Sequence, residues 1–440
     1  MPEGMLAASM FPALFVLIFL GIPVSFSLIG VSFLYGFLAF GGSLGAILYD
    51  RVFGVANSPV LAAVPLFIFM GAMLERSAIA ERLFDAMLLW LGRLPGGLAV
   101  ATIAMSAVFA AATGIIGAVE AVIGMMAIPA MMRLNYDKGL ISGTICAGGS
   151  LGTIIPPSIV VIIYGSIAEL SIGELFAGIL IPGGLMVLFF LLYLIARSWL
   201  RPQDGPPVAP EVVDLPLGEK IVRTLYAMLP AVALIMAVLG AILGGIASPT
   251  EAASVGAIGA VLLTILYREF SLGLLFRSLS KTLTITSMVM LIVVGGTSFS
   301  SVFLVLGGNH LIDNLVEALA LGPGGSVVMF LFIVFLLGFV LDWVTVVLIC
   351  VPLFLPILRE FQIDQIWFAV MMMIVIQTAY LTPPMAPAIF YLRTIAPPDI
   401  TYSDMYRGVI PFVILEILVL GVVAVFPSAA TYLPKLLLGF

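Results

Sequence analysis

Residues 148–158 read GGSLGTIIPPS and residues 381–384 read LTPP, so a double proline interrupts each of two long apolar segments. Two consecutive prolines remove two backbone donors, free carbonyl oxygens just upstream and favour a new helix downstream. Unpaired peptide groups are costly in hydrocarbon, so such breaks persist at membrane depth only where protein buries them or a polar cavity accepts them. The two breaks therefore predict a polar site inside a membrane protein.

The composition of the chain shows why a membrane is its expected environment. Of the 440 residues, 63% are hydrophobic and 9% are charged, whereas an ordinary soluble domain has roughly 45–50% and about 25%. This excludes a soluble globule and predicts an all-α polytopic membrane protein in a lipid bilayer. The single histidine, His310, leaves no His-based metal site or Ser-His triad, and no nucleic-acid partner is expected. Cys146 and Cys350 are expected as small buried hydrophobes.

Ten spans and two re-entrant hairpins are predicted from the apolar stretches. A crossing needs about 20 apolar residues for a hydrocarbon core about 30 Å thick. Segments 97–132 and 325–358 are too long for one straight crossing and carry a central break, so we interpret them as hairpins that enter and leave by the same face. The spans are expected at 6–20, 24–40, 60–74, 138–168, 175–196, 225–246, 250–266, 282–306, 365–395 and 406–426.

The two halves of the chain repeat one another. At an offset of 227 residues, identical residue types coincide, namely Pro129 with Pro356, Asp137 with Asp364, Pro156-Pro157 with Pro383-Pro384, and Tyr164 with Tyr391. The proline-rich stretch 197–223 lies between the halves and is interpreted as an extended cytoplasmic linker. The predicted first repeat, 1–196, contains hairpin 97–132 and broken helix 138–168; the second, 224–440, contains hairpin 325–358 and broken helix 365–395.

Five crossings in each half invert the second repeat relative to the first, an arrangement typical of secondary transporters. Placing the N-terminus outside puts 14 of the 17 lysines and arginines in the cytoplasm and leaves Arg51, Arg359 and Lys435 outside. Because cytoplasmic loops carry the excess of Lys and Arg, both termini are predicted to be periplasmic. Segments 80–94 and 312–321 precede the hairpins and are expected as interfacial helices, either arms that hold a moving part or simple surface connections.

Freed carbonyl oxygens next to a hydroxyl suit a hard monovalent cation such as Na⁺, while half-helix N-termini present positive dipole ends to an anion. The candidate ligands are therefore taken from the breaks and the hairpin tips, mostly through backbone oxygens. The first proposed Na⁺ site comprises Thr113, Gly152, Ile155 and Pro157, and the second comprises Gly338, Ala379, Thr382 and Met385. The alternative is that these positions are only kinks in packed helices.

Four polar residues are candidates for the substrate site: Asp342, Glu120, Thr345 and Ser158. Asp342 follows a long apolar run, and an ionisable group at that depth is either functional or a cap of the hairpin helix. Glu120 lies just past the first tip and is expected to touch substrate or to pair with a cation. Among other polar residues, Arg393 is expected as an anchor at the cytoplasmic rim, Glu251 in a capping box and Glu416 in an outer span where it contacts a partner helix.

Five motifs, in this order, resemble those of the large membrane subunit of tripartite ATP-independent periplasmic (TRAP) transporters. They are Gly21-Ile22-Pro23, Val64-Pro65-Leu66-Phe67, residues 148–158, Ser248-Pro249-Thr250-Glu251-Ala252-Ala253 and residues 381–384. The resemblance implies an elevator-type, Na⁺-driven importer of organic acids in the bacterial inner membrane. It implies two partners, a small four-helix membrane subunit and a periplasmic substrate-binding protein. It also implies a transport domain of hairpins and broken helices that moves against a scaffold of outer helices.

By motif, the eight candidate cation ligands match the family's sodium sites, and Asp342 matches its acidic residue at the second tip. The first tip, residues 113–117, has fewer hydroxyls than the commoner family pattern. Residues 386–393 resemble the subgroup labelled for mannitol or chloroaromatic compounds. One alternative is a stand-alone ion-coupled carboxylate or anion transporter of similar architecture. Another, a polytopic membrane enzyme, requires buried His, Cys or paired carboxylates, of which this chain has almost none.

Overall fold

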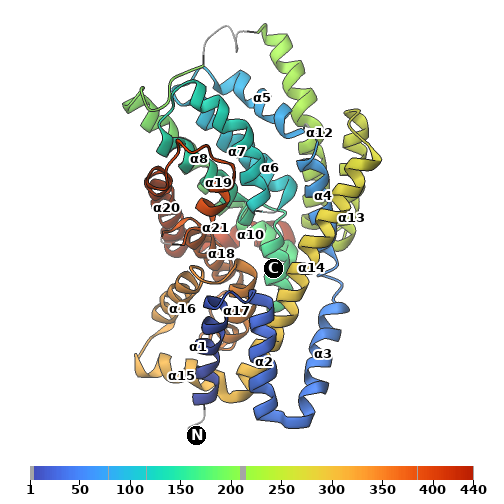
Figure 1. Cartoon of the computed structure of the whole chain (residues 1–440), viewed down its shortest axis with the longest axis vertical. Coiled ribbons are helices and arrows are strands. Elements are labelled where there is room, and N and C mark those ends of the chain that lie inside the picture. Colours follow the sequence, from blue (N-terminus) through green and yellow to red (C-terminus); the bar gives the residue numbers. More distant parts are fainter. Residues whose placement is uncertain (1–3, 78, 115, 209–214, 384, 440) are drawn as a thin grey trace.

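The structure is a computed structural model that describes residues 4–77, 79–114, 116–208, 215–383 and 385–439, and its regular elements in these ranges are helices (Figure 1). The first half contains α1 (Met5–Phe19), α2 (Val24–Phe40), η1 (Gly41–Ser43), α3 (Leu44–Ala56), α4 (Ala63–Glu75), α5 (Ile79–Leu91), α6 (Gly97–Thr113), α7 (Ile116–Arg133), α8 (Lys138–Ser150), η2 (Leu151–Thr153), α9 (Ile159–Ala168) and α10 (Ile172–Leu200). The second half contains α12 (Leu217–Leu243), α13 (Pro249–Leu266), α14 (Leu272–Phe303), η3 (Leu304–Gly308), α15 (Asn309–Ala318), α16 (Pro323–Leu337), α17 (Trp343–Glu360), α18 (Gln365–Leu381), α19 (Pro387–Ile395), α20 (Tyr402–Val425) and α21 (Ser428–Leu438).

The elements follow the same order in the two halves. In each half an amphipathic helix, α5 or α15, precedes a pair of helices, α6–α7 or α16–α17. A helix broken by a non-helical segment, α8–α9 or α18–α19, comes next, followed by a long helix, α10 or α20. Figure 1 shows α6 and α7 in the upper part of the molecule and α16 and α17 in the lower part. The helix pairs and broken helices therefore lie where the sequence predicts them, although Ile115 of the first tip and Pro384 of the second break lie outside the described residues.

Two helices are absent from the predicted set of spans. α14 runs without interruption through 32 residues, whereas the stretch of equivalent length in the first half, 44–75, is divided into α3 and α4. The prediction included α4 but missed α3, because Asp50 and Arg51 place charges in its middle. It also missed α21, an 11-residue helix in which Pro434 and Lys435 interrupt the apolar pattern.

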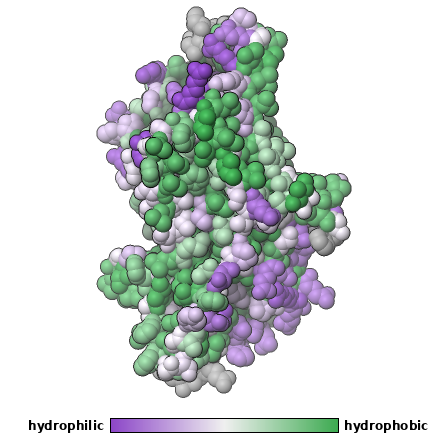
Figure 2. Space-filling model, turned by 90° about the vertical axis from the view of Figure 1, so that its right-hand side faces the viewer, coloured by the Kyte–Doolittle hydropathy of each residue, from purple (hydrophilic) through white to green (hydrophobic). Residues whose placement is uncertain are grey.

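The size and surface of the helices fit a bilayer. Within the described ranges, seven helical segments are long and apolar enough to cross a membrane, and α1, α6, α9, α16 and α18 are shorter apolar helices. Large apolar side chains are exposed on several of the long helices, such as Phe33 on α2, Phe276 on α14 and Ile414 on α20. Figure 2 shows hydrophobic residues over much of the visible face, with hydrophilic residues gathered near its upper end and at its lower right. Such a surface is stable against lipid and not against water.

The predicted linker is shorter than 197–223 and is docked on the first half. α10 continues to Leu200 and α12 begins at Leu217, so helices occupy both ends of the predicted stretch. Three backbone hydrogen bonds of 2.8–3.0 Å hold its first part, from Gly96 N to Gly205 O, from Val208 N to Gly92 O, and from Asp137 N to Asp204 O. These bonds attach the linker to the base of the α6–α7 hairpin and to the start of α8. Residues 201–208 lie between the helices, as expected of a linker, and backbone pairing fixes them in place.

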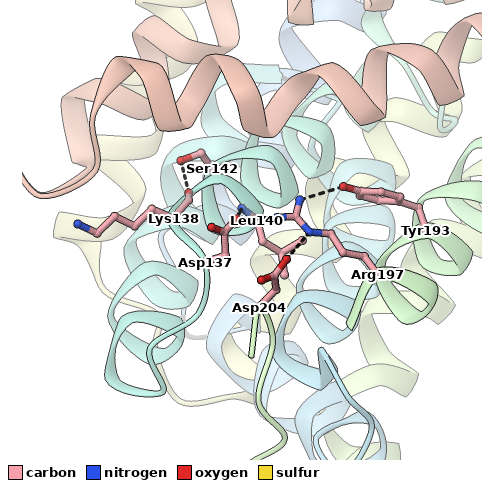
Figure 3. Close-up of polar contacts among 7 residues, drawn as sticks. All are labelled: Asp137, Lys138, Leu140, Ser142, Tyr193, Arg197 and Asp204. Atoms are coloured by element: carbon pink, nitrogen blue, oxygen red, sulfur yellow. Dashed lines mark hydrogen bonds and ion pairs between the residues drawn. The ribbon is translucent and has the colours of Figure 1, made fainter. Parts of the chain in front are cut away.

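Arg197 strengthens this attachment from α10. Its guanidinium donates to Asp204 in the linker at 3.0 Å, to Asp137 at 2.7 Å and to the Tyr193 hydroxyl at 3.0 Å. Asp137 in turn caps α8, accepting a hydrogen bond from the backbone of Leu140 at 2.8 Å. Figure 3 shows the guanidinium between Tyr193 and the two aspartates. Because the Arg197 guanidinium bonds two carboxylates at once, it fixes α10, the linker and the start of α8 relative to one another.

Glycines allow α8 and α20 to pack with their backbones in contact. A Cβ at Gly143 would overlap the carbonyl of Gly408, and a Cβ at Gly408 would overlap the carbonyl of Gly139. Gly139 and Gly143 are four residues apart and therefore lie on one face of α8. Close approach of this kind is typical of helix pairs in membranes. It brings the end of α8, where the first break begins, next to the middle of α20.

Candidate functional site

The first hairpin tip lies directly against the first break. α6 ends at Thr113, and Gly114 follows in the left-handed conformation with φ of 61°. A Cβ at Gly114 would lie 3.0 Å from the carbonyl oxygen of Pro157, so the tip and the second proline of the break are in backbone contact. Gly152 lies in η2, against which α6 packs, and Ile155 N donates to Leu151 O in the same turn at 3.0 Å. The structure thus brings the four first-site candidates into one region.

The hydroxyls of this region are engaged locally. Thr113 Oγ1 donates to Phe109 O at 3.0 Å within α6, and Ser158 Oγ donates across the break to Thr153 O at 2.8 Å. Both side chains are buried. Oxygen atoms for a cation at the first break would therefore come mainly from the backbone, as the sequence indicates for a tip with few hydroxyls. Ser158 closes the break, and its contact with a substrate stays a prediction.

The second tip packs against the last turn of α18, just before the second break. α16 ends at Leu337, and a Cβ on the following Gly338 would lie 2.6 Å from the Cβ of Ala379 in α18. Thr382 Oγ1 donates to Thr378 O at 2.6 Å, and Thr382 O accepts from Ala386 N at 3.1 Å. The structure therefore places Gly338, Ala379 and Thr382 together. Met385 belongs to the same turn, but its side chain is 43% exposed, so only its backbone is a reasonable ligand.

Asp342 forms the N-cap of α17 in the second hairpin. Its Oδ1 accepts from the backbone N–H groups of Val344 at 2.9 Å and Thr345 at 3.2 Å. Its Oδ2 accepts from the Thr345 hydroxyl at 2.7 Å. Both carboxylate oxygens are thus engaged by the first turn of the helix, which is the capping role that the sequence left open. Asp342 and Thr345 hold the second tip in shape, and a direct contact with substrate stays a prediction for both residues.

Glu120 lies where the first hairpin, the end of α8 and the second broken helix meet. Its side chain is fully buried on α7, and its Oε2 accepts from the Tyr380 hydroxyl at 2.8 Å. Its Oε1 finds no hydrogen-bond partner in the described part of the chain, although the weakly donating thiol of Cys146 lies beside the carboxylate. A Cβ at Gly149 would overlap the Glu120 side chain, so glycine is required there. A buried carboxylate oxygen without a partner is costly unless a ligand uses it.

Sequence reasoning missed the tyrosines of this site. Tyr380, at the end of α18, bonds Glu120, and the ring of Tyr391 on α19 lies 6.5 Å from that of Tyr380. A Cβ at Gly117 in the first hairpin would lie 2.9 Å from the Tyr391 ring. The second broken helix therefore contributes aromatic side chains to the surroundings of the first tip. The sequence shows that Tyr391 pairs with Tyr164 in the repeat. It does not show that Tyr391 lies against Gly117 of the first hairpin.

Three other polar residues have defined positions. Glu251 forms the predicted capping box with Ser248, whose backbone N–H lies 2.8 Å from the carboxylate. Arg393 donates to Ile400 O at 3.0 Å and lies over the ring of Tyr402, so it is held by the connection between α19 and α20. Glu416 does not face a partner helix as expected, because it is fully buried and its Oε1 lies 3.4 Å from Ser150 Oγ. The glycine contacts between α8 and α20 turn this side of α20 inward.

Known proteins are similar in sequence to this chain over nearly its whole length. Residues 11–429 match the family described as tripartite ATP-independent periplasmic transporter, DctM component. The chain is 30% identical over 426 residues to the sialic acid TRAP transporter permease protein SiaT of Haemophilus influenzae, covering 96% of this chain and 67% of that protein. It is 29% identical over 388 residues to the C4-dicarboxylate TRAP transporter large permease protein DctM of Pseudomonas aeruginosa, covering 88% of each chain. It is 29% identical to the ectoine TRAP transporter large permease protein TeaC of Halomonas elongata, over 96% and 97% of the two chains.

Solved structures share the fold. The crystal structure of the YdaH transporter of Alcanivorax borkumensis superposes with a TM-score of 0.61 at 14% identity, covering 87% of each chain. MtrF of Neisseria gonorrhoeae superposes with a TM-score of 0.52 at 12% identity, covering 89% of this chain and 85% of that one. The relatives are transporter permeases and not enzymes, which confirms that expectation, whereas the mannitol or chloroaromatic subgroup stays a prediction. With the family match over residues 11–429, these findings show that the chain is a multi-pass membrane protein that belongs to the tripartite ATP-independent periplasmic transporter family as a DctM component.

Proposed function

We propose that this chain is the large permease of a Na⁺-driven importer of organic acids. Its partners are a small four-helix membrane subunit and a periplasmic protein that delivers the solute at the bacterial inner membrane. The observation that carries the proposal is that each hairpin tip packs at a broken helix, Gly114 against Pro157 in the first break and Gly338 against Ala379 in the turn that precedes the second break. Two such junctions in inverted repeats form a pair of ion sites near the midplane of a membrane.

The chemistry of these junctions fits a sodium ion. Carbonyl and hydroxyl oxygens are hard ligands, and a helix that ends inside the protein leaves carbonyl groups without helical partners. The first site takes oxygens from Thr113, Gly152, Ile155 and Pro157. The second takes oxygens from Gly338, Ala379, Thr382 and Met385. Na⁺ binding at each junction would hold a tip against its break and thereby order the site for substrate.

The half-helices that follow the breaks are suited to the carboxylate of the solute. α9 begins after Ser158 and α19 after Ala386, and neither N-cap residue makes a side-chain hydrogen bond to its helix. No N-cap side chain therefore occupies the first N–H groups of α9, which lie at the positive end of its helix dipole. α19 begins with Pro387, which has no N–H, and Ile389 N donates to Ala386 O at 2.8 Å, so α19 presents mainly its dipole to an anion. In this proposal Glu120 contributes beside the first tip, and Asp342 and Thr345 keep the second tip in position.

Alternating access follows from the same arrangement. The two hairpins and two broken helices move as one transport domain, and the outer helices form the scaffold, as in an elevator. The docked linker, residues 201–208, moves with the first hairpin, because its backbone bonds join it to Gly92 and Gly96. The distribution of lysine and arginine supports a topology with both termini in the periplasm. The names of the relatives, which include sialic acid and C4-dicarboxylate transporters, support an organic acid as solute.

Replacing Thr382 with valine is expected to raise the Na⁺ concentration that gives half-maximal uptake about fivefold, with little change in expression. The substitution removes one oxygen from the second site, and a lost hydrogen-bond-like interaction is worth about 1 kcal/mol. The measurement is solute uptake by the reconstituted complex at varied Na⁺. Thr284→Val is the matched control, because its hydroxyl donates only to Ser280 O within α14. Equal losses of uptake and of expressed protein for Thr382→Val would support a purely structural kink.

A further inference from the structure

One hydrogen bond joins equivalent positions of the two repeats. Nε2 of Gln377 in α18 donates to Oγ of Ser150 at the end of α8, at 3.0 Å. The two residues are 227 positions apart, which is the offset at which the halves of the sequence align. Equivalent residues that touch must lie on the pseudo-two-fold axis that relates inverted repeats. This bond therefore marks the point where the two broken helices meet.

Two more side chains complete this junction. The Thr153 hydroxyl in η2 lies 3.1 Å from Gln377 Oε1, and Oε1 of Glu416 from α20 lies 3.4 Å from Ser150 Oγ. Ser150, Gln377 and Glu416 are 0% exposed, and Thr153 is 1% exposed. Water therefore does not compete for these contacts. Hydrogen bonds in such a low-dielectric setting are stronger than at a surface, and breaking one leaves an unsatisfied buried group.

The junction adjoins both groups of proposed cation ligands. Ser150 and Thr153 flank Gly152 of the first site in sequence, and Gln377 precedes Ala379 of the second site by two residues. The Gln377 amide uses both of its polar atoms on the first broken helix, its nitrogen on Ser150 and its oxygen on Thr153. The Thr153 hydroxyl, which has a single hydrogen, also lies 2.8 Å from Ser150 O, so it shares that hydrogen between Ser150 O and Gln377 Oε1. A movement of either break that shifts these backbones must either move the other break with it or rupture the Gln377–Ser150 bond and separate Gln377 from Thr153.

We infer that Ser150, Thr153 and Gln377 are positioning residues that couple the two cation sites, so that filling one site favours the backbone geometry required at the other. The inference rests on the proposed sodium coupling, and it assigns the cooperativity between the ions to a specific contact. Thermodynamic linkage makes such a coupling reciprocal. Its signature is a steep dependence of uptake on Na⁺ that becomes shallow when the contact is removed.

The test compares Ser150→Ala, Gln377→Met and the double variant in the complete complex, reconstituted with its binding protein. Solute uptake is measured across a range of Na⁺ concentrations. Each single variant is expected to lower the Hill coefficient for Na⁺ from about 2 to about 1 and to raise half-saturation about fivefold or more. The maximal rate at saturating Na⁺ is expected to stay within about twofold, because no proposed ligand has been removed. The double variant is expected to lose no more than Gln377→Met alone, because that substitution already removes the bond to Ser150 together with the contact to Thr153.

Ser142→Ala is the matched control on α8. Ser142 is equally buried, but its hydroxyl donates only to Lys138 O within the same helix. Variants of Ser150 and Gln377 that keep the wild-type Hill coefficient would overturn the coupling, as would an equal loss of steepness in Ser142→Ala. Uptake by the wild-type complex that ignores Na⁺ would instead overturn the proposed function itself. The two failures are therefore distinguishable in one set of measurements.

Discussion

Glu120→Gln is expected to lower the initial rate of solute uptake by at least tenfold while the protein remains folded. Glutamine has nearly the same shape, so the contact with Gly149 and an acceptor for the Tyr380 hydroxyl are both retained. The substitution puts an amide in place of an ionisable carboxyl group whose Oε1 has no hydrogen-bond partner among the described residues. Interactions with a charged group are worth about 1.5–3 kcal/mol, which corresponds to a loss of roughly tenfold to a hundredfold.

The measurement is uptake by proteoliposomes under an inward Na⁺ gradient, with thermal unfolding of the purified protein measured in parallel. Glu317→Gln is the control for charge removal, because Glu317 is exposed on α15. Tyr380→Phe separates packing from charge, since it keeps the carboxylate and removes its donor. Wild-type uptake by Glu120→Gln would contradict a role for the charge. A fall in unfolding temperature that matches the fall in uptake would instead assign Glu120 to packing.

Asp342→Ala is expected to reduce uptake about tenfold and to lower thermal stability, and Asp342→Asn is expected to restore both. Alanine removes three hydrogen bonds from the first turn of α17, and loss of an N-cap costs about 0.5–2 kcal/mol. The tip next to Gly338 would then no longer be held against α18. Asparagine is as good an N-cap as aspartate, because its side-chain oxygen accepts from the same N–H groups.

The comparison of these two variants decides between a cap and a charge. Uptake and unfolding temperature of both variants are measured in the same reconstituted preparation. Thr345→Val provides a milder test, because it removes only the hydroxyl bond to Oδ2. If Asp342→Asn transports as poorly as Asp342→Ala but unfolds like the wild type, the negative charge itself is required at the second tip. That result would indicate that Asp342 contacts the substrate or a cation directly.

Apolar length and proline placement made most of the fold predictable. The span predicted at 24–40 coincides with α2, and the breaks after Ser150 and Leu381 follow from the two double prolines. α3 was missed because Asp50 and Arg51 lower the hydropathy of its middle to that of a loop. Its counterpart in the repeat is part of the uninterrupted α14. The internal repeat pairs residues 44–56 with the first part of α14 and so indicates a helix that hydropathy alone does not.

The candidate site was predictable only as a set of segments. The sequence locates tips and breaks, because backbone geometry there depends on local glycine and proline. It does not show which side chains meet across 227 or more residues, such as Gln377 with Ser150 or Tyr380 with Glu120. The docking of the linker was not predictable either. Residues 201–208 are held by backbone hydrogen bonds, which almost any residue type can make.

Solute uptake under defined ion gradients tests the central claim most directly. The chain is reconstituted in liposomes with its small subunit, and the binding protein is loaded with an organic acid identified by thermal-shift screening. Uptake is expected under an inward Na⁺ gradient and not under an equal K⁺ gradient or a proton gradient, and only when the binding protein is present. Uptake without the binding protein would favour a stand-alone transporter. Uptake of equal rate in the absence of Na⁺ would contradict the claim that the paired hairpin tips and helix breaks are sodium sites.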